Sequence, residues 1–287
     1  MTFDSDDFSK KLQKYRTKTF RTSVLSRVRS IPEAIDFVNE RGFIFFWPIK
    51  GVVFPSLWAA NAGDRDVPDN HDDPGHITWD WKDKMLGKKE WYYGRVLKRK
   101  NTIISLEALP YFYALSPNYG EYETDYLTQY EQGLLTAESK AVYEALLNNG
   151  PMDTLMLRKF ARMTSQSSAS RFQRAVDQLQ MEFKILPVGI SEAGAWNYAF
   201  MYDVLPRHFE WIEEKAGAIT EPEARAYLLK RYLVSIGADQ ISHIRSMFRW
   251  DEKTLQRTIN RVLEENLLPI SSVTLDEKPA LTLNDLL

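Results

Sequence analysis

The sequence predicts a mostly α fold with small β wings (α+β), and the stretch from Thr136 to Pro206 carries that prediction. Three segments with a helical spacing of apolar residues come first, and two β-prone apolar runs follow them. After Pro206 the same order of three helices and two short strands recurs. Three helices followed by a hairpin are typical of a winged helix, so we expect tandem winged-helix domains.

The central unit justifies this prediction element by element. Its first helix is expected after the N-cap Thr136 and its second after the N-cap Asp153. The third helix has apolar residues at i, i+3, i+4 and i+7, so this stripe should pack inward; it comprises Phe172, Ala175, Val176 and Leu179. The predicted helices cover residues 137–147, 154–163 and 168–180, and the predicted strands cover 184–188 and 196–204.

The opposite face of the third helix is polar and basic. Arg171, Arg174 and Gln178 share this face, and Ser168 stands where the helix begins. A buried stripe backed by cations and amides is what a helix lying in the major groove of DNA requires. Ser168, Arg171 and Arg174 are therefore the first candidates for groove contacts, with Gln178 beside them.

The C-terminal copy follows the same plan, with helices over 221–234, 240–248 and 250–265 and strands over 267–273 and 280–283. Its third helix has an apolar set of Leu255, Ile259, Val262 and Leu263. The cations expected to contact DNA there are Lys253, Arg257 and Arg261. Because charge is nearly balanced in this copy, contact with another protein is the alternative.

The N-terminal third contains two basic segments. Residues 8–29 could hold a phosphate backbone or form a solvated leader. We expect a helix that is capped by Ser30 and ends at Gly42, followed by a strand over 43–47. Further along the chain, we expect a helix over 79–87 and a hairpin over 90–106. The segment from Trp79 to Lys100 contains eight basic and three acidic residues, which gives a local charge of 8 − 3 = +5. The basic residues are Lys82, Lys84, Lys88, Lys89, Arg95, Lys98, Arg99 and Lys100.

Tryptophans and tyrosines alternate with these cations, so they could stack on bases or belong to the core. A helix before a basic-tipped hairpin is also how a wing is built, so this part could be a degenerate winged helix. The predicted domains are 1–133, a Trp/Tyr-rich N-terminal domain, then 134–207 and 208–287, two winged helices.

The loop 61–76 holds His71 and His76 beside Asp72 and Asp73. These groups could form a metal or acid–base site, or a polar turn in which aspartates bond the local backbone. The spacing matches no usual zinc motif, so we predict neither a metal nor a cofactor.

The composition of the chain limits the classes of protein to which it can belong. A net charge of −2 means that DNA binding must come from local patches. The chain has no cysteine, its first residues are acidic rather than basic, and no apolar run approaches the ~20 residues of a membrane span, so we expect a cytoplasmic protein without membrane contact. Phosphate-binding loops, dinucleotide fingerprints and hydrolase elbows are also missing.

Four segments carry a resemblance to a known family: Gly150–Arg158, Ser170–Leu179, Met201–Arg207, which closes the wing, and Tyr227–Leu268. They resemble the AlkZ/YcaQ-type winged-helix DNA glycosylases, more closely a divergent AlkZ-related branch. The resemblance implies tandem winged helices around duplex DNA, and in the enzymes it implies hydrolysis of the N-glycosidic bond of an alkylated or crosslinked base.

The catalytic signature of those enzymes, a Gln-x-Gln or Gln-x-Asp pair after a Gly-aromatic-aliphatic lead, is not matched. The nearest match, Gly42–Trp47, places Phe45 and Trp47 at the two polar positions, where neither ring can position a water. Glu40, Asp72 or Asp73 could take the place of the missing catalytic pair. The alternative is that the glycosylase activity has been lost. The sequence therefore predicts binding of double-stranded DNA, damaged or intact, in DNA repair or genome maintenance; the alternatives are a DNA glycosylase and a winged-helix scaffold for protein contacts.

Overall fold

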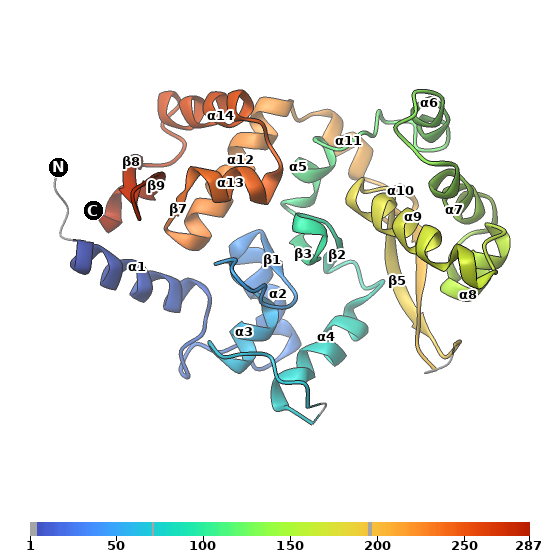
Figure 1. Ribbon diagram of the computed structural model, residues 1–287, viewed down its shortest axis with the longest axis horizontal. Helices are drawn as coiled ribbons and strands as arrows, with labels where there is room; N and C mark the ends of the chain where they lie inside the picture. The colour runs from blue at the N-terminus through green and yellow to red at the C-terminus, as the bar shows by residue number, and fades with distance from the viewer. Residues whose placement is uncertain (1–4, 71, 195–196) are drawn as a thin grey trace. The chain divides into compact units, whose positions relative to one another are not determined.

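A computed structural model describes residues 5–70, 72–194 and 197–287. About 52% of the chain is helical, and the strands form small three-stranded sheets, which confirms the predicted fold class. The chain divides into two compact units (Figure 1). Unit 1 comprises Met1–Trp79, Ile103–Ala108 and Glu221–Leu287, and unit 2 comprises Asp80–Thr102 and Leu109–Thr220.

The central part of unit 2 has the predicted helices and hairpin. In chain order it contains α7 (Ala137–Asn149), β4 (Met152–Asp153), α8 (Thr154–Phe160), η3 (Gln166–Ser168), α9 (Ala169–Met181), β5 (Ile185–Ser191) and β6 (Ala199–Val204). The predicted start of the last strand, Trp196, lies outside the described residues. The strands form an antiparallel sheet in the order β4-β6-β5, with Met152 opposite Tyr202 and Ile185 opposite Val204.

Both predicted helix caps in this part are confirmed. The Thr136 hydroxyl accepts a hydrogen bond from the Ser139 N–H at 3.1 Å, and one Asp153 carboxylate oxygen accepts bonds from two N–H groups at 2.9 Å. Strand β4, which follows α7 directly, was not predicted. Two residues are too few to show a period of alternation, so only pairing with β6 reveals this strand.

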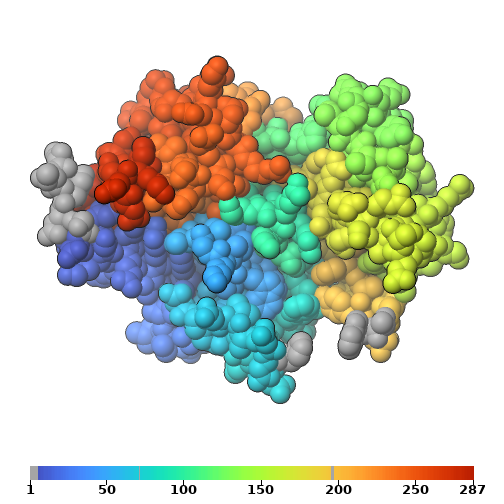
Figure 2. Space-filling view, viewed as in Figure 1, coloured from blue at the N-terminus to red at the C-terminus, as the bar shows by residue number. Residues whose placement is uncertain are grey.

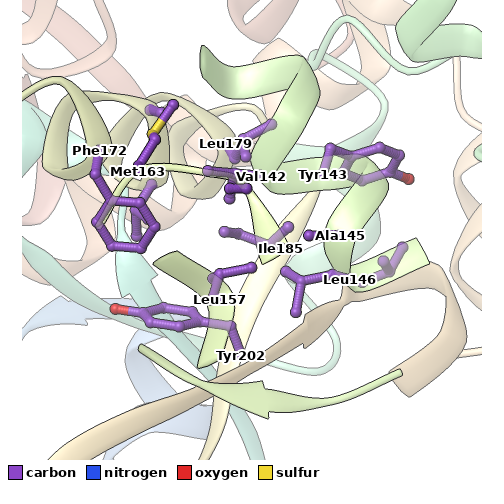
Figure 3. Close-up of a cluster of buried hydrophobic side chains, with 14 of the residues drawn as sticks. Val142, Tyr143, Ala145, Leu146, Leu157, Met163, Phe172, Leu179, Ile185 and Tyr202 are labelled. Atoms are coloured by element: carbon purple, nitrogen blue, oxygen red, sulfur yellow. The ribbon is translucent and has the colours of Figure 1, made fainter. Parts of the chain in front are cut away.

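The core of this part joins all three helices to the sheet (Figure 3). Phe172 and Leu179 of α9 pack with Leu146 of α7, Leu157 of α8 and Ile185 of β5, and each of these side chains is buried. The predicted inward stripe of the third helix is therefore confirmed. Burying an aliphatic or aromatic side chain of this size contributes about 1.5–3 kcal/mol, so the orientation of α9 about its own axis is strongly fixed.

The remaining elements of unit 2 precede and follow this core. The helix α4 (Ile77–Met85) enters the unit at Asp80, and β2 (Trp91–Arg95), the turn η2 (Leu97–Arg99) and β3 (Asn101–Ser105) form the predicted hairpin segment. Only the first two residues of β3 belong to unit 2, since unit 1 resumes at Ile103. The short helices are α5 (Leu109–Tyr113), α6 (Asp125–Glu131), α10 (Leu205–His208) and α11 (Ile212–Gly217).

Unit 1 contains the predicted second copy. Its elements are α12 (Glu221–Ile236), β7 (Ala238–Gln240), α13 (Ile241–Phe248), α14 (Glu252–Glu264), β8 (Ile270–Leu275), β9 (Lys278–Leu283) and η4 (Asn284–Leu286). The sheet order β7-β9-β8 repeats the order β4-β6-β5, because a short strand after the first helix again pairs with the last strand. The N-terminal elements of this unit are α1 (Ser5–Thr19), α2 (Ile31–Arg41), β1 (Phe43–Phe45), α3 (Leu57–Ala62) and η1 (Pro74–His76).

The basic N-terminal segment is folded rather than a solvated leader. Helix α1 docks on the end of α12, where the Tyr15 hydroxyl donates to the Val234 carbonyl at 2.7 Å and Arg16 donates to the Ile236 and Ala238 carbonyls at 3.0 and 2.7 Å. The last carbonyls of a helix lack partners inside the helix and carry partial negative charge. Arg16 therefore stabilises the end of α12 and is not available to a phosphate.

No helix among the described residues is long and apolar enough to cross a bilayer.

Candidate nucleic-acid interface

The outward face of α9 carries two exposed arginines, Arg171 and Arg174. In the space-filling view the yellow atoms of α9 lie on the side turned toward the viewer (Figure 2). Arg171 forms an ion pair with Glu138 of α7 at 3.2 Å, and its side chain remains 54% exposed. Within residues 5–70, 72–194 and 197–287, no carboxylate pairs with Arg174. Arg171 must therefore release Glu138 before it can contact another anion, whereas Arg174 has no carboxylate to release among the described residues.

Ser168 and Gln178, the other two candidates on this helix, are used by the fold. Ser168 is 4% exposed, and its hydroxyl donates to the Ser165 carbonyl at 2.7 Å. The Gln178 amide donates to the Leu134 carbonyl at 3.0 Å and accepts from the Ser139 hydroxyl at 2.8 Å. Gln178 therefore holds α9 against the start of α7, a role that helical periodicity could not distinguish from an outward position.

The basic hairpin packs beside α9. The Arg95 guanidinium pairs with Asp177 at 3.1 Å, the Arg95 N–H donates to the Gln180 side chain at 3.2 Å, and the turn η2 also contacts α9. The Val96 N–H closes the turn by donating to the Lys100 carbonyl at 3.2 Å. Consequently the hairpin's cationic tip, Lys98, Arg99 and Lys100, belongs to the same folded unit as the arginines of α9.

The tip has an unusual backbone. Lys98 and Arg99 adopt left-handed conformations, with φ of 50° and 58°. This conformation costs an L residue about 1–2 kcal/mol, so the surrounding turn must enforce it. Arg99 and Lys100 are exposed and Lys98 is half-buried. The tip and the α9 arginines together form what we call the α9–hairpin surface: Lys98, Arg99, Lys100, Arg171 and Arg174.

The remaining cations of this segment have different surroundings. Lys88 and Lys89 are exposed, whereas Lys84 pairs with Asp80 at 2.8 Å. Lys82 is 1% exposed; its ammonium lies 2.5 Å from Asp83 and 2.9 Å from the Tyr198 hydroxyl. Burial lowers the pKa of Lys82, and its contacts fix α4 to the β5–β6 hairpin. Lys82 is therefore excluded from the proposed DNA contacts.

Four of the five aromatic side chains interleaved with these cations are core residues. Trp81, Trp91, Tyr92 and Tyr93 are all buried, and the Tyr92 hydroxyl donates to the Gln180 carbonyl at 3.2 Å. Of the two interpretations of this segment, packing in the core is confirmed for these rings, so they cannot stack on bases in this structure. Trp79, at the end of unit 1, is 45% exposed.

Helix α14 is the counterpart of α9 in unit 1. Leu255, Ile259 and Val262 are buried as predicted, but Leu263 is 43% exposed, so its place in the predicted stripe is wrong. Leu263 lies at the edge of the apolar face and one residue from the helix end, where the chain no longer covers it. Of the cations, Lys253 and Arg257 are exposed and Arg261 pairs with Glu265 at 3.1 Å.

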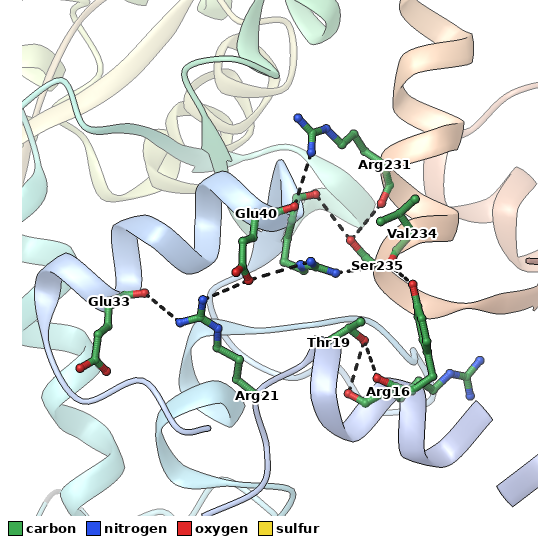
Figure 4. A network of polar contacts seen from close by, with 10 residues as sticks. Arg16, Thr19, Arg21, Glu33, Glu40, Arg231, Val234 and Ser235 are labelled. Carbon is green, nitrogen blue, oxygen red and sulfur yellow. Dashed lines mark hydrogen bonds and ion pairs between the residues drawn. The ribbon is translucent and has the colours of Figure 1, made fainter. Parts of the chain in front are cut away.

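The three acidic candidates lie in unit 1, Glu40 in the last turn of α2 and the consecutive residues Asp72 and Asp73 just before η1. Glu40 pairs with Arg21 at 3.0 Å (Figure 4). Asp73 pairs with Arg65 at 2.6 Å and accepts from the Gly75 N–H at 2.8 Å. The hydrogen bond from Arg65 lowers the pKa of Asp73. Asp72 is exposed.

The described part of the loop 61–76 forms the predicted polar turn, in which the Asp73 carboxylate accepts from the N–H of Gly75, two residues further along. His71 lies outside the described residues. Across 5–70, 72–194 and 197–287, no three His, Asp or Glu side chains are grouped as metal ligands.

The two positions nearest to the glycosylase signature lie in an aromatic cluster. Phe45 is 1% exposed in β1, and Trp47, which follows β1, packs against Trp58, Trp79 and His76 with ring centroids 5.6–6.2 Å apart. No amide or carboxylate is contributed by either position. A water could therefore be activated here only by another residue.

Comparison with known proteins gives a consistent result. The model of the family described as "AlkZ related" matches residues 28–249. A solved structure, the Streptomyces sahachiroi DNA glycosylase AlkZ, superposes with a TM-score of 0.58 at 13% sequence identity, over 96% of this chain and 70% of that one. None of the curated proteins matches the chain. Because the family model covers most of the sequence, including α9 and both copies' first helices, the chain belongs to the AlkZ-related family.

Proposed function

We propose that this protein binds double-stranded DNA through tandem winged helices, the segments 134–207 and 208–287, with the α9–hairpin surface as the main contact. The observation that carries the proposal is the packing of the hairpin against α9, through the 3.1 Å pair between Arg95 and Asp177. This packing holds the tip next to a helix whose outward arginines are exposed. Such a helix can enter a major groove while the tip contacts phosphates.

Local charge supports the proposal. The five cations of the α9–hairpin surface and the neighbouring Arg95 stand against Asp177 and Glu138, which leaves 6 − 2 = +4 in a chain of net charge −2. Charges separated by more than about 10 Å are largely screened at 0.1 M salt, so the local value governs encounter with DNA. The family membership and the fold shared with a DNA glycosylase favour a role in DNA repair.

The test is a titration of fluorescent duplex DNA over a range of salt concentrations. Replacing Lys98, Arg99 and Lys100 by alanine should flatten the plot of log affinity against log salt by up to about 2.7 units, since each neutralised phosphate contributes ~0.9. A triple variant of exposed lysines distant in sequence, K50A/K215A/K230A, removes the same charge and should change the slope by less than about one unit.

Equal slopes for the two triple variants would overturn the assignment of the tip. A wild-type protein without salt-dependent affinity for duplex DNA would overturn the function and favour a scaffold for protein contacts.

The second candidate function is hydrolysis of the N-glycosidic bond of an alkylated or crosslinked base. The fold shared with the Streptomyces glycosylase is the observation that favours it. Incubation with alkylated duplex and chromatography of the released base tests it. If base is released, the variants E40Q, D72N and D73N show which of the three carboxylates the hydrolysis requires. Release that survives all three variants would exclude these residues, and no release would leave DNA binding alone.

A further inference from the structure

The N-terminal segment before the family match contains a second concentration of positive charge. Between Phe8 and Ser30 there are eight lysines and arginines and no aspartate or glutamate. The family model begins at residue 28, so seven of these eight cations precede the family match. A density of cations without acids is the electrostatic footprint of a polyanion site when the side chains are available.

The structure separates these cations into two groups. Three of the four arginines make polar contacts within the fold: Arg16 binds the end of α12, Arg21 pairs with Glu40, and Arg29 donates to the Val24 carbonyl at 3.1 Å. Arg27 is half-buried. Lys11 pairs with Asp7 at 3.1 Å. By contrast, Lys10, Lys14 and Lys18 are exposed, and among the described parts of the chain no acidic side chain pairs with them.

These three lysines form one stripe on α1. Residues spaced by four lie on the same helix face, about 6 Å apart at ~1.5 Å of rise per residue. The stripe therefore extends about 12 Å along the helix, whereas one strand of duplex DNA carries a phosphate per ~3.4 Å of its axis. A helix lying along a groove edge could thus place each lysine near a different phosphate.

The stripe also borders a concave surface. A cavity of about 530 Å³ is lined by all three lysines together with Thr17, Ser23 and Ser26. The Ser23 and Ser26 hydroxyls lie 2.6 Å apart, on the loop that follows α1. Ammonium groups and hydroxyls are typical partners of phosphate oxygens in protein–DNA interfaces. Concavity, hydroxyls and unpaired cations therefore coincide at one place in unit 1.

We propose that the α1 groove, formed by Lys10, Lys14, Lys18, Thr17, Ser23 and Ser26, binds the phosphate backbone of DNA as a second contact of this protein. The inference rests on the proposed DNA binding and extends it beyond the winged-helix segments. It is a contact without base specificity, because ammonium groups on a helix face read charge rather than base edges. Lysine suits this role as a mobile point charge, whereas Arg16, Arg21 and Arg29 donate to backbone carbonyls of the fold.

The experiment uses the full chain, duplex DNA and two triple variants. K10A/K14A/K18A should flatten the salt slope by up to about 2.7 units, so that over a fourfold rise in salt the wild type loses ~40-fold more affinity than the variant. K50A/K215A/K230A is the charge-matched control. Unchanged thermal unfolding of the α1 variant is expected, since its three lysines make no contact that the fold needs.

Three outcomes are decisive. A slope that is flattened in the α1 variant but not in the K50A/K215A/K230A control supports the groove. A slope equal to that of the control, in a protein whose hairpin variant still loses salt dependence, overturns the groove and leaves the proposed function standing. If the α1 variant loses binding to phosphatidylserine vesicles but keeps the wild-type slope on DNA, the ligand is a lipid surface and the proposal is wrong.

Discussion

The ion pair between Arg171 and Glu138 gives the sharpest test of the α9–hairpin surface. If Arg171 contacts DNA, the pair must open first, and Glu138 then competes with the phosphate or base for the guanidinium. Replacing Glu138 by glutamine removes this competition while it keeps the size of the side chain. We therefore expect E138Q to bind duplex DNA more tightly than the wild type.

The magnitude follows from the geometry of the pair. Its nitrogen–oxygen distance is 3.2 Å, and the two side chains are 54% and 28% exposed. Ion pairs this accessible contribute about 0.2–1 kcal/mol. At ~1.4 kcal/mol per factor of ten, release of the competitor should raise the affinity by about 1.4- to 5-fold.

The assay is the fluorescence titration at low salt, run as a double-mutant cycle. E138Q also removes a negative charge near the surface, and that general effect would persist without Arg171. The gain should therefore vanish when E138Q is made in the R171A background. An equal gain in both backgrounds would refute the direct contact of Arg171 with DNA, and a loss of affinity in E138Q would refute the competition itself.

Three further predictions concern the scaffold that positions this surface. Leu179→Ala, at a fully buried position of α9, should lower the free energy of unfolding by about 2–5 kcal/mol in urea titrations, and a loss below 1 kcal/mol would contradict the packing described. Burial lowers the pKa of Lys184 from 10.5 to about 8. Because the unfolded chain holds this proton to higher pH, the free energy of unfolding should rise as pH increases from about 8 toward 10.5, and Lys184→Met should remove the rise. Burial, and then the charge of Lys89, lower the pKa of His208 from 6.5 to about 4. The free energy of unfolding should therefore decrease as pH falls from about 6.5 to 4. In NMR, the His208 ring signals should titrate near 4 rather than near 6.5.

Local sequence signals predicted the helices of 137–180 and 221–265 well because their causes are local, whereas α1 was not predicted. The apolar spacing of Phe172, Ala175, Val176 and Leu179 and the cap at Thr136 each act within a few residues, and both are found in the structure. The caps at Ser30 and Asp153 also depend on residues only a few positions away, and both are found in the structure. The short strands β4 and β7 were not predicted, since their hydrogen bonds come from β6 and β9, far along the chain.

The candidate interface shows the same division. The sequence by itself determined which residues are cationic and that Arg171 and Arg174 lie opposite a buried stripe. Only the tertiary structure decided that Lys82 and Gln178 are used inside the fold, and that the arginines near α1 differ from its lysines. Whether a polar side chain meets solvent or a carbonyl depends on what packs opposite it. For Arg16 that partner is the end of a helix more than 200 residues away, which no local pattern encodes.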